Sequence, residues 1–170
     1  MEILPEVSVR QFRAEEWPTY RELRLLALAD TPDAFGSTFE LEAARPDEHW
    51  AERVSVAGKS PSQLLLVAEL GAERVGLASG VIAPAEPEIA RVFQMWVAPR
   101  ARGRGCATAL LDTLVAWARA AHASSVGLCV TCGDTAARRL YERAGFTPHG
   151  ALGTLRPDSS VRVQPMLLTF

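Results

Sequence analysis

The sequence has few cysteines, no strong excess of either charge and no long apolar run at its start. Its three cysteines are odd in number and too few for a disulfide framework, so we expect reduced thiols. The formal net charge of -2 excludes a whole-chain attraction to nucleic acid or to an anionic membrane. The first ten residues include Glu2 and Glu6 and contain no stretch suited to a signal peptide or a membrane span. We therefore expect a cytoplasmic protein.

The chain length suits one compact domain with one core. Of its 170 residues 48% are hydrophobic, and we expect a single domain over residues 1–170. Cys129 and Cys132 form a CxxC pair, but side chains three residues apart on a strand point to opposite faces. We expect two ordinary thiols there and no metal.

Hydrophobic periodicity divides the chain into short strands and helices. Helices are expected over residues 15–30, 106–122 and 134–145, with a broken helical region between 31 and 56 that is regular from Pro46. Strands are expected over residues 7–12, 63–70, 74–83, 89–97, 124–131, 146–152 and 161–168. This order predicts an α/β fold of the α+β kind, with a mixed and largely antiparallel sheet of about seven strands and helices on both faces.

The most informative segment is the turn between the strand at 89–97 and the helix at 106. Gly103 and Gly105 leave no Cβ to block the approach of a ligand to the main chain, and Arg102 and Arg104 add positive charge. The amides that open a helix and the positive end of its dipole are typical of a phosphate site, although a plain tight turn would have the same glycines. A Walker loop is excluded because no Gly-Lys-Ser/Thr follows. A dinucleotide fingerprint is excluded because no third glycine follows after two further residues.

Two motifs together resemble the GNAT superfamily of N-acetyltransferases. The first, Arg102-Gly103-Arg104-Gly105-Cys106-Ala107, is similar to the family's Arg/Gln-x-x-Gly-x-Gly/Ala. The second, DTAARRLYERAGF at residues 134–146, is similar to Asn-x-x-Ala-x-x-Leu-Tyr-x-x-x-Gly-Phe and departs from it only at Asp134. With the strand order, the resemblance covers residues 7–168.

The resemblance implies an acetyl-CoA-dependent N-acetyltransferase, with a primary amine of a small molecule or protein attacking directly in a ternary complex. It implies a splayed parallel pair of strands at the centre of the sheet, with the pantetheine arm against the main chain of the first strand. The diphosphate would lie on the amides of the glycine turn, and the acetyl oxygen near the N–H of Val97. The coenzyme-binding residues implied are Met95, Trp96, Val97, Arg102, Gly103, Arg104, Gly105, Cys106, Ala107, Thr108, Asp134, Ala137 and Tyr141.

The same resemblance makes Tyr141 the candidate general acid. A phenol, with a pKa of about 10, is protonated at neutral pH and could protonate the departing thiolate. A purely structural role is the alternative, because Ala137, Leu140 and Ala144 share one helix face with Tyr141. Asp134 is expected mainly to cap this helix, since its negative charge disfavours contact with a phosphate.

The general base and the acceptor pocket are less clearly marked. A water chain or one of four chemically able side chains could remove the amine proton. These side chains are Glu40, His49, Glu88 and His149. The pocket would be built by the first two helices and the closing hairpin, and aromatic side chains could line it. For Phe39 and Trp50, packing in the core is an equally good explanation. The lining candidates are Phe35, Phe39, Trp50 and Trp96.

Other functions stay open at this point. The protein could use a longer acyl chain, acetylate an antibiotic or polyamine, or bind coenzyme A as a sensor without turnover. Nucleic-acid binding through Arg91, Arg100, Arg102 and Arg104 is disfavoured by the acidic chain. The apolar C-terminal segment 161–170 predicts a homodimer.

Overall fold

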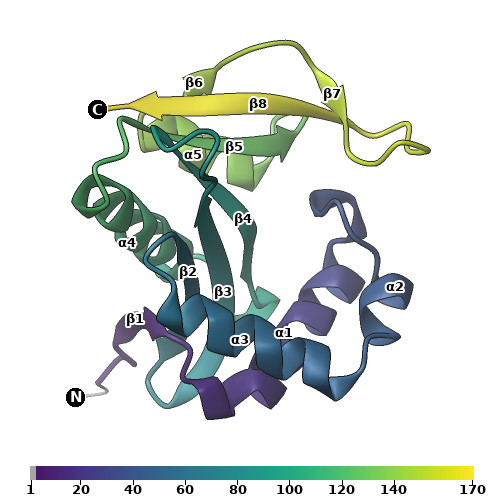
Figure 1. Cartoon of the computed structure of the whole chain (residues 1–170), viewed down its shortest axis with the longest axis vertical. Helices are drawn as coiled ribbons and strands as arrows, with labels where there is room; N and C mark the ends of the chain where they lie inside the picture. Colours follow the sequence, from purple (N-terminus) through teal and green to yellow (C-terminus); the bar gives the residue numbers. More distant parts are fainter. Residues whose placement is uncertain (1–2) are drawn as a thin grey trace.

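The computed structural model describes residues 3–170 (Figure 1). Its α-helices are α1 (Trp17–Asp30), α2 (Phe39–Ala43), α3 (Asp47–Lys59), α4 (Cys106–Ala120) and α5 (Ala136–Arg143). Its strands are β1 (Val7–Gln11), β2 (Gln63–Leu70), β3 (Glu73–Ile82), β4 (Ile89–Val97), β5 (Ser125–Thr131), β6 (Thr147–Pro148), β7 (Gly153–Thr154) and β8 (Arg162–Thr169).

All strands belong to one mixed sheet in the order β1-β2-β3-β4-β5-β8-β6, with β7 also beside β8. Within residues 3–170 only β4 and β5 run parallel, and this pair lies at the centre of the order. The predicted fold class is confirmed, but the sheet has eight strands instead of about seven. The excess arises because the expected strand over 146–152 is wrong: Pro148 and Gly150 interrupt it and leave only two-residue pairings with β8.

The sheet buries apolar side chains on both faces. Leu65 and Val67 of β2 pack in the cluster that α1 and α3 cover, whereas Leu64 and Leu66 pack in the cluster that α4 covers. Figure 1 shows α3 in front of the central strands and α4 to their left. Burial on both faces explains why β2 is a continuous apolar run without alternation.

The helices match the predicted positions except at their ends. Helix α1 begins at Trp17 instead of Glu15, and α5 spans Ala136–Arg143 instead of residues 134–145. The broken region contains a separate five-residue helix, α2, and then α3, which ends at Lys59 instead of Val56. Helix α4 ends at Ala120, two residues early, and His122 then adopts a positive φ of 64°. No helix within residues 3–170 is long and apolar enough to cross a membrane.

The apolar C-terminal segment is partly used within the chain. Met166 is buried in the core, and the guanidinium of Arg119 lies 3.9 Å from the ring centre of Phe170. The homodimer expected from this segment stays a prediction.

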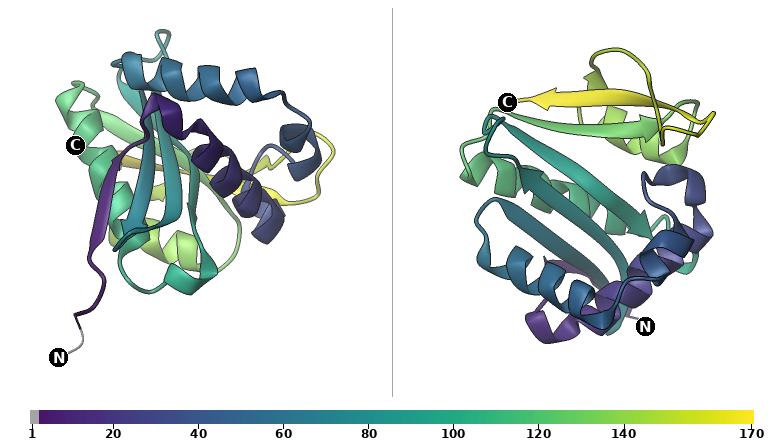
Figure 2. Two further views of the ribbon diagram at one scale, coloured as in Figure 1. Left: turned by 90° about the horizontal axis from the view of Figure 1, so that it is seen from below. Right: turned by 45° about the vertical axis from the view of Figure 1, so that its right-hand side comes forward.

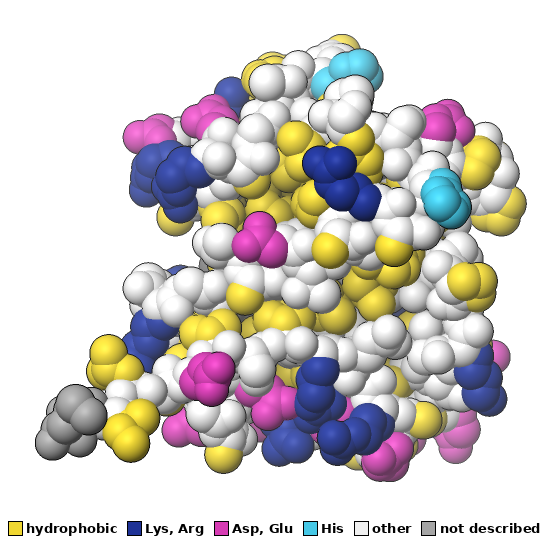
Figure 3. Space-filling view, turned by 90° about the vertical axis from the view of Figure 1, so that its left-hand side faces the viewer, with side chains coloured by type: hydrophobic (Ala, Val, Ile, Leu, Met, Phe, Trp, Pro, Cys, Tyr) yellow, Lys and Arg dark blue, Asp and Glu magenta, His cyan; other side chains and the backbone are white. Residues whose placement is uncertain are grey.

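In the space-filling view from the α4 side, apolar side chains line a hollow that crosses the face, and charged side chains gather along the lower edge (Figure 3).

Candidate active site

The central feature of the site is a wedge between β4 and β5, bounded by residues 92–97 and 128–131. The two strands pair only at their beginnings, at Ile89 with Ser125, Ala90 with Val126 and Arg91 with Gly127. Beyond this point they diverge, as Figure 2 shows. Main-chain groups along the wedge therefore have no partner strand and are available to water or a ligand.

The N–H of Val97 faces this wedge. The N–H of Ala98 donates to the carbonyl oxygen of Val75 in β3 at 2.7 Å. Because successive residues of a strand turn their main-chain groups to opposite edges, Val97 directs its N–H toward β5. Trp96, which pairs with Leu77, directs its main chain to β3 instead. Of the two, only Val97 can offer a main-chain donor inside the wedge.

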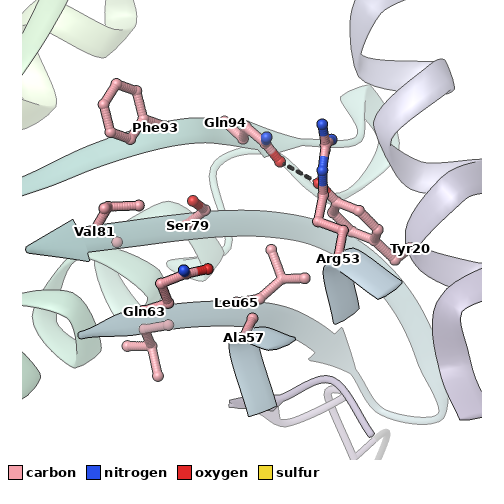
Figure 4. A pocket seen from close by; sticks show the side chains of 11 residues that line it. Tyr20, Arg53, Ala57, Gln63, Leu65, Ser79, Val81, Phe93 and Gln94 are labelled. Atoms are coloured by element: carbon pink, nitrogen blue, oxygen red, sulfur yellow. Dashed lines mark hydrogen bonds between the residues drawn. The ribbon is translucent and has the colours of Figure 1, made fainter. Parts of the chain in front are cut away.

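A bulge in β4 lies beside the wedge. The register with β3 shifts between Leu77 and Ser79, and Gln94 has a positive φ of 58°, a strained conformation for a residue other than glycine. The buried hydroxyl of Tyr20 donates to Oε1 of Gln94 at 2.7 Å and so holds the bulge from α1 (Figure 4). Because of the bulge, consecutive side chains Phe93 and Gln94 line the same cleft.

The glycine turn directly follows the wedge. Gly103 and Gly105 have φ values of 76° and 88°, which other residues rarely adopt, and a Cβ at either position would meet no atom within 4 Å. Gly105 is the N-cap of α4 and offers no side-chain cap to the first amides of the helix. These amides lack intrahelical partners and face open space, which fits a bound diphosphate.

The side chains around the turn differ in their exposure to solvent. Arg104 and Thr108 are exposed beside it, and Ala107 is half-buried. Cys106 packs in the core, and burial raises the pKa of its thiol. Cys106, Cys129 and Cys132 are all free thiols.

Arg102 does not leave its charge free for a phosphate, contrary to the expectation from sequence. Its Nε donates to the carbonyl oxygen of Val97 at 3.0 Å, and its Nη2 pairs with Oδ2 of Asp30 at 2.6 Å. The same Asp30 oxygen accepts from Nε1 of Trp96 at 3.0 Å. Arg102 thus ties the end of β4 to the end of α1, a contact that joins residues too distant in sequence for a local pattern to predict.

Replacing Asp30 with alanine should lower the free energy of unfolding by about 1–3 kcal/mol, because the indole N–H of buried Trp96 loses its acceptor. The hydrogen bonds from Trp96 and Arg102 hold the pKa of Asp30 below its usual range. The stabilisation is therefore complete above the unfolded pKa of about 3.9 and is lost as the pH falls through the folded-state pKa. Chemical denaturation at pH values on both sides of this range measures the effect.

The exposed Asp158 supplies the control variant, Asp158→Ala, which should unfold like the wild type at each pH. A stability difference between Asp30→Ala and the wild type that grows in acid would contradict the assigned role of Asp30.

Tyr141 lies on the α4 side of the sheet. It belongs to the same buried cluster as Val97 at the end of β4, Cys106 at the start of α4 and Val130 of β5. Its side chain is 6% exposed and packs against Phe146 with ring centres 5.9 Å apart. Burial raises the pKa of Tyr141 to about 12, with no contribution from a neighbouring charge. The phenol is therefore protonated at neutral pH.

The cap of α5 is Thr135, and the expectation that Asp134 caps this helix is wrong. The hydroxyl of Thr135 accepts from the N–H of Arg138 at 3.1 Å. The carboxylate of Asp134 instead pairs with Nη1 of Arg139 at 2.7 Å in an exposed position. The chain enters the helix one residue later than the motif suggested, so Asp134 lies in the preceding turn. Ala137 is exposed on this helix.

A cleft of about 220 Å³ opens on the α1 and α3 side of the bulge. Figure 4 shows Tyr20 and Arg53 at one end, Phe93 at the other, and Ser79 in the strand between them. Sequence reasoning missed these lining residues. A glutamine at position 94, inside the otherwise apolar run from Val92 to Val97, is the one local signal that could have marked the cleft.

The predicted aromatic lining is largely wrong. Phe35, Trp50 and Trp96 are at most 5% exposed and fill the core between α1, α3 and the sheet. Only Phe39 is well exposed, on α2. Large aromatic rings fill the space between two helices and a sheet well. These three rings are therefore used for core packing and do not line a pocket.

The four candidate bases are not brought together. Glu88 stands at the paired end of the β4–β5 pair, where its carbonyl accepts from Ser125, and not at the diverging end. Glu40 and His149 are exposed on α2 and after β6. His49 has its Nε2 enclosed without a partner among residues 3–170, and burial lowers its pKa, with further lowering by nearby arginines.

The chain is similar in sequence to known acetyltransferases. The sequence profile of the Acetyltransferase (GNAT) family matches residues 10–146. The mycothiol acetyltransferase of Beutenbergia cavernae is 32% identical over 126 residues, which make up 74% of this chain and 39% of that protein. The chain thus spans about two fifths of the length of the curated relative it matches.

Solved structures share the fold at low sequence identity. The acetyltransferase of the GNAT family from Streptococcus pneumoniae superposes with a TM-score of 0.82 and 19% identity over 97% of this chain and 99% of that one. Spermidine N-acetyltransferase from Vibrio cholerae, solved with CoA and spermine, superposes with a TM-score of 0.76 and 17% identity. The match covers 96% of this chain and 95% of that one.

Proposed function

Because the chain belongs to the acetyltransferase (GNAT) family, whose profile covers residues 10–146, we propose that it transfers the acetyl group of acetyl-CoA to a primary amine. The amine attacks the thioester directly while both substrates are bound. The observation that carries this proposal is the wedge between β4 and β5, which ends directly at the uncapped amides of the glycine turn. A flat sheet with a capped helix would offer neither feature.

Coenzyme A binds in this proposal mainly through the main chain. The diphosphate lies on the amides of the glycine turn and the first turn of α4, where the helix dipole favours negative charge. The pantetheine arm extends along the unpaired edge of β4. The exposed guanidinium of Arg104 and hydroxyl of Thr108 add contacts at the entrance.

The thioester carbonyl lies against the N–H of Val97. As the amine attacks, the carbonyl oxygen gains negative charge, and a fixed main-chain donor stabilises it. Loss of one such donor elsewhere costs about 2.7–4 kcal/mol in transition-state stabilisation. The hydrogen bond from Arg102 to the carbonyl of Val97 and the bulge at Gln94 hold this segment of β4 in place.

Tyr141 protonates the thiolate that leaves. A phenol with a pKa of about 12 is a weak donor to a thiolate, whose reference pKa is near 8.5. However, the burial that disfavours the phenolate also disfavours a thiolate in the same cluster, so the thiolate's pKa rises too. This matching keeps the proton transfer feasible. No protein base is assigned. One ammonium proton leaves through water before the attack, and the proton that the nitrogen loses as the amide forms restores the hydroxyl of Tyr141 through water.

A panel of amines with acetyl-CoA tests the proposal. The panel contains amino acids, polyamines, aminoglycosides and peptides, and the released coenzyme A thiol is measured together with the mass of the acetylated product. We expect amine-dependent release for at least one class. Tight binding of coenzyme A without turnover for any amine would indicate a sensor, and faster transfer from longer acyl-CoA donors would correct the acyl group.

A further inference from the structure

A partly buried group of charges lies between α1, α2 and α3. It consists of Arg24, Glu42, Arg45 and Arg53, which we call the cationic cluster. Oε1 of Glu42 accepts from the hydroxyl of Ser37 at 2.8 Å, while its Oε2 lies 3.3 Å from Nε of Arg45 and 3.6 Å from Nη1 of Arg53. Glu42 itself is 4% exposed. One buried carboxylate thus faces two guanidinium groups, and the guanidinium of Arg24 adds a third positive charge nearby.

Arg24 is the member without a partner. Its side chain is 4% exposed, and its Nε and Nη1 are enclosed with no hydrogen-bond partner among residues 3–170. Its guanidinium carbon lies 4.7 Å from the ring centre of Phe35, which offers a cation–π contact but no acceptor. A buried guanidinium with unmet donors is costly, and a further negative charge nearby would stabilise it.

The cluster reaches the cleft through Arg53. This side chain lines the cleft and is 29% exposed, and its Nη1 lies 3.3 Å from the hydroxyl of Tyr20. Tyr20 in turn donates to Gln94 at the bulge of β4. Arg24 is placed one helical turn after Tyr20 on α1 and feels the charges of Glu42 and Arg53. The unpaired charge of Arg24 therefore lies close to Arg53, and Arg53 is the member that reaches the cleft beside the bulge.

We propose that Arg53 binds a carboxylate of the acceptor, with the unpaired positive charge of Arg24 close by adding to the attraction, so that the acceptor is a small amine of the amino-acid class. This inference rests on the proposed acetyl transfer. Guanidinium groups match carboxylates in a bidentate geometry and remain charged at neutral pH. The cleft volume of about 220 Å³ is below the range of about 300–1,000 Å³ common for drug-sized ligands, which favours a small acceptor over a large antibiotic.

Matched acceptor pairs test the inference. Leucine is compared with isoamylamine and lysine with cadaverine, because each pair differs only by the carboxylate. Phosphoethanolamine serves as a phosphate-bearing arm. We expect kcat/KM for the amino acid to exceed that for its partner amine by at least about 30-fold, the usual scale for a buried charged contact. A preference for phosphoethanolamine would overturn the carboxylate assignment.

Variants separate recognition from folding. Arg53→Gln should bring the ratio of kcat/KM between the amino acid and its partner amine down to about one, and Arg24→Gln should lower the same ratio part of the way. Arg24→Lys keeps the charge and should recover part of the loss. Arg13→Gln, at an exposed arginine before α1, is the control and should change neither substrate. If Arg24→Gln fails to fold, Arg53→Gln alone decides the outcome.

The results distinguish this inference from the function beneath it. Equal transfer to both members of each pair, or equal losses for both in the variants, would overturn carboxylate recognition and leave acetyl transfer standing. Absence of transfer to every amine, despite bound acetyl-CoA, would overturn both.

Discussion

Replacement of Gly105 with valine should weaken the binding of coenzyme A by at least about 100-fold, which corresponds to about 2.7 kcal/mol. At φ 88° a β-branched side chain is strained by about 1–3 kcal/mol. Its methyl groups would also occupy the space in front of the helix amides, where the present structure has no atom within 4 Å of a Cβ. Calorimetric titration with coenzyme A measures the affinity.

The matched control is Gly150→Val. Gly150 has a similar φ of 90° and equally open surroundings, but it lies in the segment between β6 and β7, outside the glycine turn. The Gly150→Val variant carries the same backbone strain but adds no atoms in front of the first amides of α4. Its affinity for coenzyme A should therefore stay near that of the wild type. Unchanged affinity in a folded Gly105→Val protein would remove the diphosphate from the glycine turn.

Replacement of Tyr141 with phenylalanine should slow the chemical step by about 10²–10⁴-fold, the scale of a lost general acid, with little change in coenzyme A affinity. The ring keeps its contact with Phe146, so the fold should be unaffected. Single-turnover transfer is the measurement, because a rate limited by product release would hide a moderate loss.

A purely structural role of Tyr141 predicts the opposite pattern. Tyr141→Phe would then keep the wild-type rate, while Tyr141→Ala would lower the free energy of unfolding by about 3–5 kcal/mol through the cavity it leaves. Tyr20→Phe is the matched comparison, since it also removes a buried hydroxyl but leaves the proton donor in place. It should slow the chemical step less than Tyr141→Phe.

The pH profile gives a second view of Tyr141. With its pKa raised to about 12, this phenol stays protonated through the alkaline range used for amine acetylation. It should therefore cause no loss of rate below about pH 11. A rate that falls with a pKa near 10 in the wild type, but not in Tyr141→Phe, would contradict the burial of this hydroxyl.

Features fixed by local chemistry were predictable from the sequence. The two glycines demand a conformation that other side chains resist, so the turn before α4 could be placed from Gly103 and Gly105 alone. The apolar spacing in α1 and α4 likewise predicted helices that face a core. The mixed, largely antiparallel sheet with its parallel pair followed from these elements and the resemblance to a known family, but the position of β8 between β5 and β6 did not.

Features set by distant contacts were not predictable. The bulge at Gln94 arises where β4 must keep register with β3, and the sequence around it reads as an ordinary strand. The contact of Asp30 with Trp96 and Arg102 depends on where α1 ends relative to β4. Arg24 resembles a surface arginine in the helical pattern, and only the packing of α2 and α3 around α1 buries it.

The most direct test of the central claim is a single-turnover reaction with acetyl-CoA labelled in the acetyl group and the best amine of the panel. We predict that label appears in the amide in a one-to-one ratio with released coenzyme A, and that the protein carries no label when the amine is omitted. Labelled protein in the absence of amine, or release of coenzyme A without a labelled amide, would contradict direct transfer in the wedge between β4 and β5.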